Sequence, residues 1–222
     1  MLEGIRAAEL RAGREKGSVR LVAVSKTYPA EAAREAVAAG AAILGENRVQ
    51  EALAKMAEVG LPADSSVEWH LIGTLQKNKA RQAVGAFALI HSVDSVELAR
   101  EIDRQAKKKG ITQRVLFEVN IASEESKHGF GPDEVVGAAV EAAKLSNIAI
   151  DGLMCVPPIT DDPEDSRPYF IKLRALLAEM NVQGVTGREL SMGMTQDYPV
   201  AVEEGATFVR VGTAIFGARN YG

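Results

Sequence analysis

Lys26 is the residue whose type and position most directly suggest chemistry. It ends the apolar run RLVAVSK (20–26), and three positions later comes Pro29, a residue common in the first turn of helices. Burial disfavours the charged form of a lysine, so a lysine at the end of a buried strand can present a neutral amine to a carbonyl group. The alternative is a lysine whose methylene groups pack on the protein while its ammonium group reaches water. The position of Lys26 alone favours this alternative. The other candidate residues, described below, instead favour a lysine that reacts with a carbonyl group.

Two turns near the end of the sequence contain residue types that bind phosphate. They are SMGMTQDYP (191–199) and RVGTAIFG (210–217). Glycine allows the backbone to approach a ligand closely, and hydroxyl and backbone N–H groups donate hydrogen bonds to phosphate oxygens. The candidates with these properties are Ser191, Gly193, Gly212 and Thr213.

Arg210 and His70 are the remaining polar candidates in apolar surroundings. A buried arginine requires a partner, and for Arg210 an ion pair with Glu118 and a contact with a ligand are equally compatible with the sequence. His70 is either a general base or a buried neutral histidine, and the second interpretation is favoured. The spacing of His70, His91 and His128 does not match a metal site, so we expect no bound metal.

Eight short apolar runs, separated by helical patterns, must position these residues. Several runs are almost continuously apolar, which is typical of parallel strands covered on both faces. Their alternation with helices predicts an α/β fold, a (β/α)8 TIM barrel, with a doubly wound open sheet as the alternative. In a barrel, the candidates would gather at the carboxyl ends of the strands, where barrels carry their chemistry. The runs are 20–26, 41–47, 66–73, 87–93, 114–121, 148–156, 188–194 and 207–213.

Composition limits the class of protein. The 222 residues carry a net charge of −4, which argues against a domain that binds nucleic acid by neutralising phosphates and gives no polybasic membrane patch. The single cysteine, Cys155, lies in an apolar run, so we expect it to pack rather than react. No stretch resembles a signal peptide or a membrane span, so we expect a cytoplasmic protein.

Several motifs together resemble a known family. They include VAVSKTYP, GENRVQEA, WHLIGTLQKNKAR, VNIASEESKHGF, GLMCVPP and LSMGMTQDYPVAVEEGATFVRVGTAIFGAR. These segments, from Val22 to Arg219, are similar to the pyridoxal 5′-phosphate (PLP) homeostasis proteins, the single-domain, PLP-binding relatives of the barrel domain of alanine racemase. The resemblance implies that residues 1–222 form one PLP-binding barrel domain like the alanine racemase N-terminal domain. The chain departs from the family in a shorter helix before the first strand and in Thr195 and Cys155.

The resemblance also implies a role for individual residues. Lys26 would hold PLP, a form of vitamin B6, as an internal aldimine, and Arg210 would face the pyridine nitrogen. The backbone of Met192 would join the four turn residues named above around the phosphate. The residues expected to line the cofactor ring are Asn47, His70 and Met154.

The expected activity is to carry PLP rather than to use it. Arginine stays protonated, so a ring nitrogen opposite Arg210 would stay unprotonated, which weakens PLP as an electron sink. Racemisation also needs a second acid or base, which the racemases supply with the help of a further domain. The chain ends at Gly222, and no tyrosine (Tyr28, Tyr169, Tyr198 or Tyr221) has a clear claim to that role.

We therefore expect a monomeric PLP carrier that delivers the cofactor to apo forms of PLP-dependent enzymes, without catalytic residues or substantial turnover. A PLP-dependent amino-acid racemase is the alternative, and a Schiff-base aldolase acting on a sugar phosphate is less favoured.

Overall fold

Eight parallel strands close into a barrel in the order of the chain, and β8 pairs with β1. The structure, a computed structural model, describes residues 1–62, 64–124 and 126–217. The closed barrel confirms the predicted (β/α)8 fold and shows that the open-sheet alternative was wrong. Arg219 and Tyr221 lie outside the described residues. The strands are β1 (Arg20–Val24), β2 (Ile43–Glu46), β3 (Glu68–Leu71), β4 (Leu89–Val93), β5 (Gln113–Val119), β6 (Ile148–Cys155), β7 (Glu189–Ser191) and β8 (Phe208–Val211).

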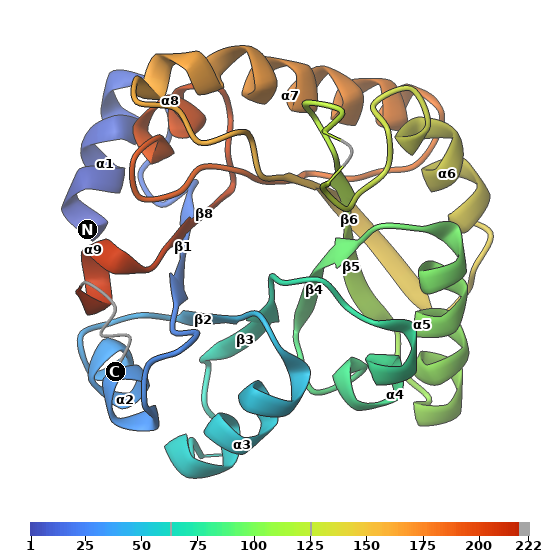
Figure 1. Cartoon of the computed structure of the whole chain (residues 1–222), viewed down its shortest axis with the longest axis horizontal. Helices are drawn as coiled ribbons and strands as arrows, with labels where there is room; N and C mark the ends of the chain where they lie inside the picture. Colours follow the sequence, from blue (N-terminus) through green and yellow to red (C-terminus); the bar gives the residue numbers. More distant parts are fainter. Residues whose placement is uncertain (63, 125, 218–222) are drawn as a thin grey trace.

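Helices surround the barrel as an outer ring (Figure 1). Each crossover between parallel strands carries a helix, which covers the outer face of the sheet. The helices are α1 (Leu2–Arg11), α2 (Ala30–Ala38), α3 (Val49–Val59), α4 (Ala80–Ala83), α5 (Val96–Lys109), α6 (Val135–Ala142), α7 (Arg167–Val182), α8 (Tyr198–Glu203) and α9 (Thr213–Phe216), with short 3-10 turns at Lys77–Lys79 and Pro163–Ser166.

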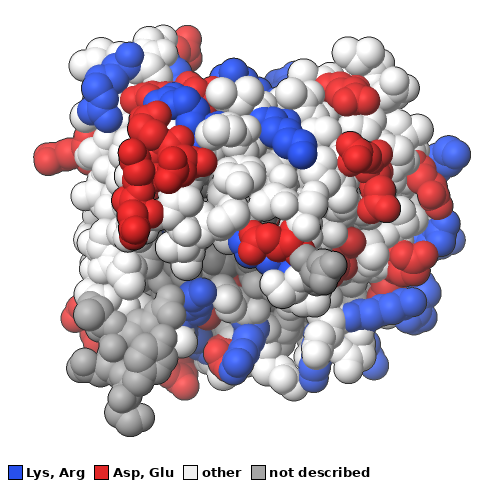
Figure 2. Space-filling view, turned by 45° about the horizontal axis from the view of Figure 1, so that its top comes forward, with Lys and Arg blue, Asp and Glu red and all other residues white. Residues whose placement is uncertain are grey.

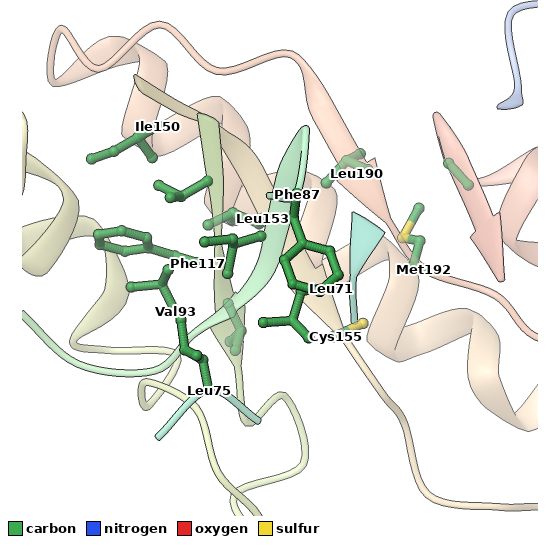
Figure 3. Packing of buried hydrophobic residues seen from close by; sticks show 14 of the residues in the cluster. Leu71, Leu75, Phe87, Val93, Phe117, Ile150, Leu153, Cys155, Leu190 and Met192 are labelled. Carbon is green, nitrogen blue, oxygen red and sulfur yellow. The ribbon is translucent and has the colours of Figure 1, made fainter. Parts of the chain in front are cut away.

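The barrel has two apolar layers, one inside the strands and one between strands and helices. The inner layer is small because side chains from all eight strands converge on the axis. The outer layer is larger and contains Cys155 and Met192, as Figure 3 shows. The inner residues are Val22, Ile43, Leu89, Leu116, Met154 and Phe208.

The surface shown in Figure 2 mixes both signs of charge, with Lys and Arg side chains placed among Asp and Glu side chains. Within the described ranges, no helix is both long enough and apolar enough to cross a membrane.

Strand register brings the end of β1 beside the end of β8. Val22 is opposite Arg210 and Ala23 is opposite Val211, and on the other side Val24 is opposite Gly45. Because all the strands are parallel, the segments that follow β1 and β8 leave the barrel at the same mouth. The residues predicted to bind a ligand after these two strands therefore meet at one end of the barrel.

The short helix α1 is fixed to the barrel by a buried carboxylate. Glu9 is 1% exposed and accepts hydrogen bonds from the backbone N–H of Val19 (2.7 Å) and of Gly17 (3.0 Å), and from the Ser18 hydroxyl (3.3 Å). Helix α1 also packs beside α8 (Figure 1). One side chain thus fixes the path of the chain into β1.

Replacing Glu9 tests this anchor. The Glu9→Ala variant leaves two backbone N–H groups without their acceptor, so we expect the free energy of unfolding to fall by about 2 kcal/mol or more. Urea denaturation gives this value. Glu3→Ala changes an exposed carboxylate of the same helix and should alter stability by less than about 0.5 kcal/mol. Equal effects of the two substitutions would contradict the assignment.

Candidate functional site

A pocket of about 300 Å³ opens at the carboxyl mouth of the barrel. Its walls come from the segments that follow β6, β7 and β8, where TIM barrels commonly bind phosphate. Three of the predicted residues, Arg210, Gly212 and Thr213, line it, and the sequence analysis did not assign the others to a site. The lining residues are Pro158, Ile159, Thr160, Pro163, Ser166, Met194, Thr195, Gln196, Asp197, Arg210, Gly212 and Thr213.

Arg210 forms the inner end of this pocket. Its side chain is buried, and it donates from Nη1 to the hydroxyl of Ser191 (2.6 Å) and from Nη2 to the carbonyl oxygen of Cys155 (2.8 Å). Burial lowers the pKa of the guanidinium, and the nearby Cys155, Glu118 and Asp197 oppose that change. The guanidinium therefore has neutral direct partners in the protein and lies beside open space.

The ion pair with Glu118, one of the two partners considered for Arg210, is not found among the described residues. Burial raises the pKa of the Glu118 carboxyl, and the charge of Arg210 partly opposes this. The two groups interact through space without direct contact. Of the two alternatives, the pocket supports a ligand contact.

His70 is a fully buried histidine with a partner on each ring nitrogen. Nε2 lies 2.9 Å from Oε2 of Glu68, and Nδ1 lies 2.9 Å from Nε2 of His91. Burial lowers the pKa of His70, although the bond to Glu68 opposes this, and burial also lowers the pKa of His91 well below 6.5. The structure agrees with a buried neutral histidine rather than a general base at the pocket surface.

Ser191 points into the barrel rather than toward the pocket mouth. Its hydroxyl accepts from Arg210 and lies 2.9 Å from Nδ1 of His91. A hydroxyl has one proton and two lone pairs, so these two contacts occupy two of its three hydrogen-bonding positions. The phosphate role of Ser191 stays a prediction, and its hydroxyl is already engaged in supporting Arg210.

In the first predicted phosphate turn, Gly193 and the N–H group of Met192 already serve the packing and the sheet. Gly193 has φ of 91°, and a Cβ there would lie 2.5 Å from the Cβ of Ala201, so packing against α8 requires this glycine. Met192 points into the outer apolar layer and its N–H donates to the Phe208 carbonyl (3.1 Å), so that N–H is used by the sheet.

The hydroxyls of Thr195 and Thr213 lie 3.3 Å apart and join the β7 and β8 segments at the pocket. Thr213 is the first residue of α9, where the N–H groups of Ile215 and Phe216 donate to the Gly212 carbonyl, and those of Thr213 and Ala214 have no backbone partner among the described residues. Hydroxyl and N–H donors are therefore available here, which favours an anion.

Lys26 lies in the turn that follows β1, and its side chain is half-buried. The next residue, Thr27, has φ of 69°, a conformation rare for a β-branched residue and found mainly where surrounding contacts impose it. Tyr28 supplies such contacts: its hydroxyl donates to the Gly217 carbonyl (2.6 Å), and its ring stacks on Phe216 at 5.0 Å. The Lys26 turn is thus attached to the segment that carries Thr213.

Asn47 and Met154 occupy the same end of the barrel. Met154 is an inner residue of β6, and Asn47 directly follows β2. A Cβ at Gly73 would come within 2.5 Å of the Asn47 carbonyl oxygen, so the close approach of the β3 segment fixes the Asn47 backbone. Their roles beside a cofactor ring stay predictions.

Cys155 is fully buried among apolar side chains (Figure 3), and burial raises the pKa of its thiol to about 12. A thiol in this state is a poor nucleophile at neutral pH. The contribution of Cys155 to the site is its backbone carbonyl, which accepts from Arg210.

A second buried network supports the residue before Lys26. The ammonium group of Lys55 donates to the Ser25 carbonyl (2.6 Å) and to Oε1 of Glu46 (2.6 Å), which also accepts from the Ser25 hydroxyl (2.6 Å). The side chains of Lys55 and Glu46 are 10% and 1% exposed. Helix α3 thereby holds the ends of β1 and β2 in place.

Glu68, His91, Glu46 and Lys55 are supporting residues that sequence reasoning did not assign to the site. The available signal was a polar side chain within an apolar run: His91 interrupts FALIHSV, and Glu46 ends AAILGE. Which residues they contact depends on strand register, which no local pattern in the sequence supplies.

Removing Lys55 tests the second network. The Lys55→Met variant leaves the Glu46 carboxylate buried without its cation, and we expect the free energy of unfolding to fall by about 3–5 kcal/mol. The double variant Lys55→Met/Glu46→Met removes both charges and should recover most of that loss. Urea unfolding curves measure both. If the double variant is as unstable as the single one, an unpaired charge does not explain the effect.

The buried histidines also predict how stability depends on pH. Below pH 6.5 the unfolded chain takes up protons on His70 and His91, whereas the folded protein resists them, so stability falls as pH falls. The limiting slope is about 1.4 kcal/mol per pH unit for each histidine. Denaturation from about pH 7.5 to about pH 5.5 measures it, and Glu118, whose pKa is raised by burial, contributes in the opposite direction.

The His91→Asn variant is the comparison for this measurement. Removal of one buried imidazole should make the dependence on pH shallower, whatever the absolute loss of stability. A slope equal to that of the unsubstituted protein would show that His91 is not a neutral buried group.

Comparison with known proteins agrees with this geometry. The family described as "Alanine racemase, N-terminal domain" matches residues 5–220. The pyridoxal phosphate homeostasis protein of Aquifex aeolicus is 46% identical over 222 residues, which cover 100% of this chain and 96% of that protein.

Solved structures extend the comparison. PipY of Synechococcus elongatus PCC7942, solved with PLP bound, superposes with a TM-score of 0.83 at 42% identity, over 96% of this chain and 99% of that one. An alanine racemase of Clostridium difficile 630 superposes with a TM-score of 0.74 at 17% identity, over 99% of this chain and 57% of its own, and shares the fold. On these matches and on its barrel, the chain belongs to the pyridoxal phosphate homeostasis protein family.

Proposed function

We propose that this chain binds PLP at the carboxyl mouth of the barrel and acts in PLP homeostasis as a carrier or buffer. The observation that carries the proposal is the placement of Arg210, Gly212 and Thr213 in one pocket beside the β1 end that leads to Lys26. The names of the relatives and the PLP bound to PipY support it. We include in the proposal that residues 1–222 form one domain.

The groups at the pocket suit the three functional parts of PLP. The amine of Lys26 would condense with the aldehyde, its nitrogen replacing the carbonyl oxygen, which leaves as water. The hydroxyls of Thr195 and Thr213 and the backbone at Gly212 would hold the phosphate. The guanidinium of Arg210 would donate to the ring nitrogen. Asn47, His70 and Met154 would surround the ring less directly.

The chemistry of Arg210 supports a carrier over an enzyme. PLP supplies a reactive aldehyde and, when its ring nitrogen is protonated, a strong electron sink. A guanidinium donates and cannot accept a proton, so Arg210 would keep the ring nitrogen unprotonated. Tyr28, the tyrosine nearest Lys26 in sequence, has its hydroxyl engaged by the Gly217 carbonyl.

The rest of the proposal concerns partners. We propose a cytoplasmic monomer that gives PLP to apo forms of PLP-dependent enzymes. The net charge of −4 and the mixed surface charge support a partner other than nucleic acid or a membrane.

Replacing Lys26 tests the covalent link. Purified protein incubated with PLP should show the absorbance band of the Lys26–PLP link, and borohydride should fix PLP to the peptide that contains Lys26. Lys26→Ala should abolish both signals. Lys16→Ala, which changes an exposed lysine, should leave them unchanged.

Two results would contradict the proposal. A protein that remains colourless with excess PLP would contradict cofactor binding. Formation of a D-amino acid over many turnovers, lost in Lys26→Ala, would favour the racemase alternative over the carrier.

A further inference from the structure

An unbroken chain of hydrogen bonds crosses the inside of the barrel. It runs from Glu68 Oε2 to His70 Nε2 (2.9 Å), from His70 Nδ1 to His91 Nε2 (2.9 Å), and from His91 Nδ1 to Ser191 Oγ (2.9 Å), and it ends with Arg210 Nη1 (2.6 Å). Arg210 lines the pocket at the carboxyl mouth, whereas Glu68 begins β3 and lines a separate cavity of about 240 Å³ at the amino mouth. The chain therefore links opposite ends of the barrel.

The two ends of this chain fix its direction. A guanidinium only donates and a carboxylate only accepts. Glu68 can only accept, so a neutral His70 carries its proton on Nε2 and accepts at Nδ1 from Nε2–H of His91. Nδ1 of His91 is then unprotonated and accepts from the Ser191 hydroxyl, which itself accepts from Arg210. The opposite direction would set an unprotonated His70 Nε2 against a carboxylate oxygen.

Burial, together with nearby cations, keeps the two histidines neutral in this arrangement. Burial is the main cause that lowers the pKa of each, and the cations Arg20 and Arg114 act in the same direction on both. Arg210 adds to the effect on His91, and only Glu68 opposes it at His70. A second proton on His91 would point at the oxygen that already accepts from Arg210. Each imidazole is thus neutral, and its two hydrogen bonds fix the orientation of the groups on either side of it.

We propose that Glu68, His70 and His91 are positioning residues that orient Arg210 toward the cofactor through Ser191. The identity of the cofactor rests on the function proposed above, whereas the direction of the chain does not. With Nη1 held by Ser191 and Nη2 held by the Cys155 carbonyl, the plane of the guanidinium is fixed in the residue that lines the pocket. The charge of Glu68 at one mouth thereby sets the geometry of the donor at the other.

Nitrogen-15 NMR of labelled histidine side chains tests the direction of the hydrogen-bond chain, in the full-length protein without added PLP. We expect both His70 and His91 to be neutral Nε2–H tautomers at neutral pH, and His91 to keep that state as the solution is acidified below pH 6.5. His128, whose side chain is 65% exposed, is the internal comparison for a histidine in contact with solvent. An Nδ1–H tautomer or an imidazolium at His91 would overturn the proposal without any substitution.

Glu68→Lys tests the coupling, because it places a donor where the chain needs an acceptor. We expect His70 to lose its Nε2–H tautomer and PLP affinity to fall about tenfold, the size expected for a misplaced charged hydrogen bond. Glu68→Gln keeps an acceptor oxygen and should retain both tautomers, with PLP affinity within about twofold. Equal PLP affinity and absorbance maximum in the two variants would refute the coupling.

The outcomes separate this proposal from the function on which it rests. If the unsubstituted protein shows the expected tautomers but binds no PLP, the proposed function fails and the chain direction stands. If it binds PLP normally with other tautomers, the positioning role fails alone. Should Glu68→Lys not fold, Ser191→Ala breaks the same chain next to Arg210: PLP affinity should fall, while His70 and His91 keep the Nε2–H tautomers that Glu68 imposes.

Discussion

The buried positive charge of Arg210 is the constraint on which the rest of the site depends. A guanidinium cannot lose its proton in a protein, and its burial costs several kcal/mol unless its N–H groups are satisfied. Ser191 from β7 and the Cys155 carbonyl from β6 supply the partners for a side chain of β8. Arg210 thus joins three neighbouring strands at the point where the pocket begins. The same contacts therefore fix the position of the pocket wall and of the positive charge beside it.

The need for a partner extends inward from Arg210. Apolar side chains make up much of the barrel interior, so the buried polar groups behind Arg210 bond to one another until the series reaches Glu68 near solvent. The Ser25–Glu46–Lys55 network follows the same rule on the other side of the strands. One network holds the end of β8 and the other holds the end of β1. Between them they set the relative position of Arg210 and the Lys26 turn.

Features that depend on neighbouring residues in the sequence could be predicted, whereas contacts between distant strands could not. The eight strands follow from short apolar runs with clear ends, and Lys26 and Arg210 stand out as polar residues in those runs, whereas their expected roles toward PLP come from the family resemblance. The contacts of Ser191 could not be predicted, because its side chain direction depends on barrel closure, which places His91 and Arg210 on either side. Gly193 matched a phosphate turn in sequence, yet its glycine is required by packing against Ala201. Local patterns identify where polar groups lie, and only strand register decides which of them meet.

Holding a pyridine nitrogen and activating it make opposite demands on the protein. A group that activates must keep a proton on the nitrogen, whereas Arg210, in the role proposed for it, would offer a hydrogen bond that fits only an unprotonated nitrogen. The groups behind Arg210 agree with this preference, because each hydrogen bond from Arg210 to Glu68 is donated in the direction of Glu68. No member of the chain has a proton directed at Arg210. This series of groups therefore receives a hydrogen bond from Arg210 and directs no proton back to it, which fits the carrier role proposed for the protein.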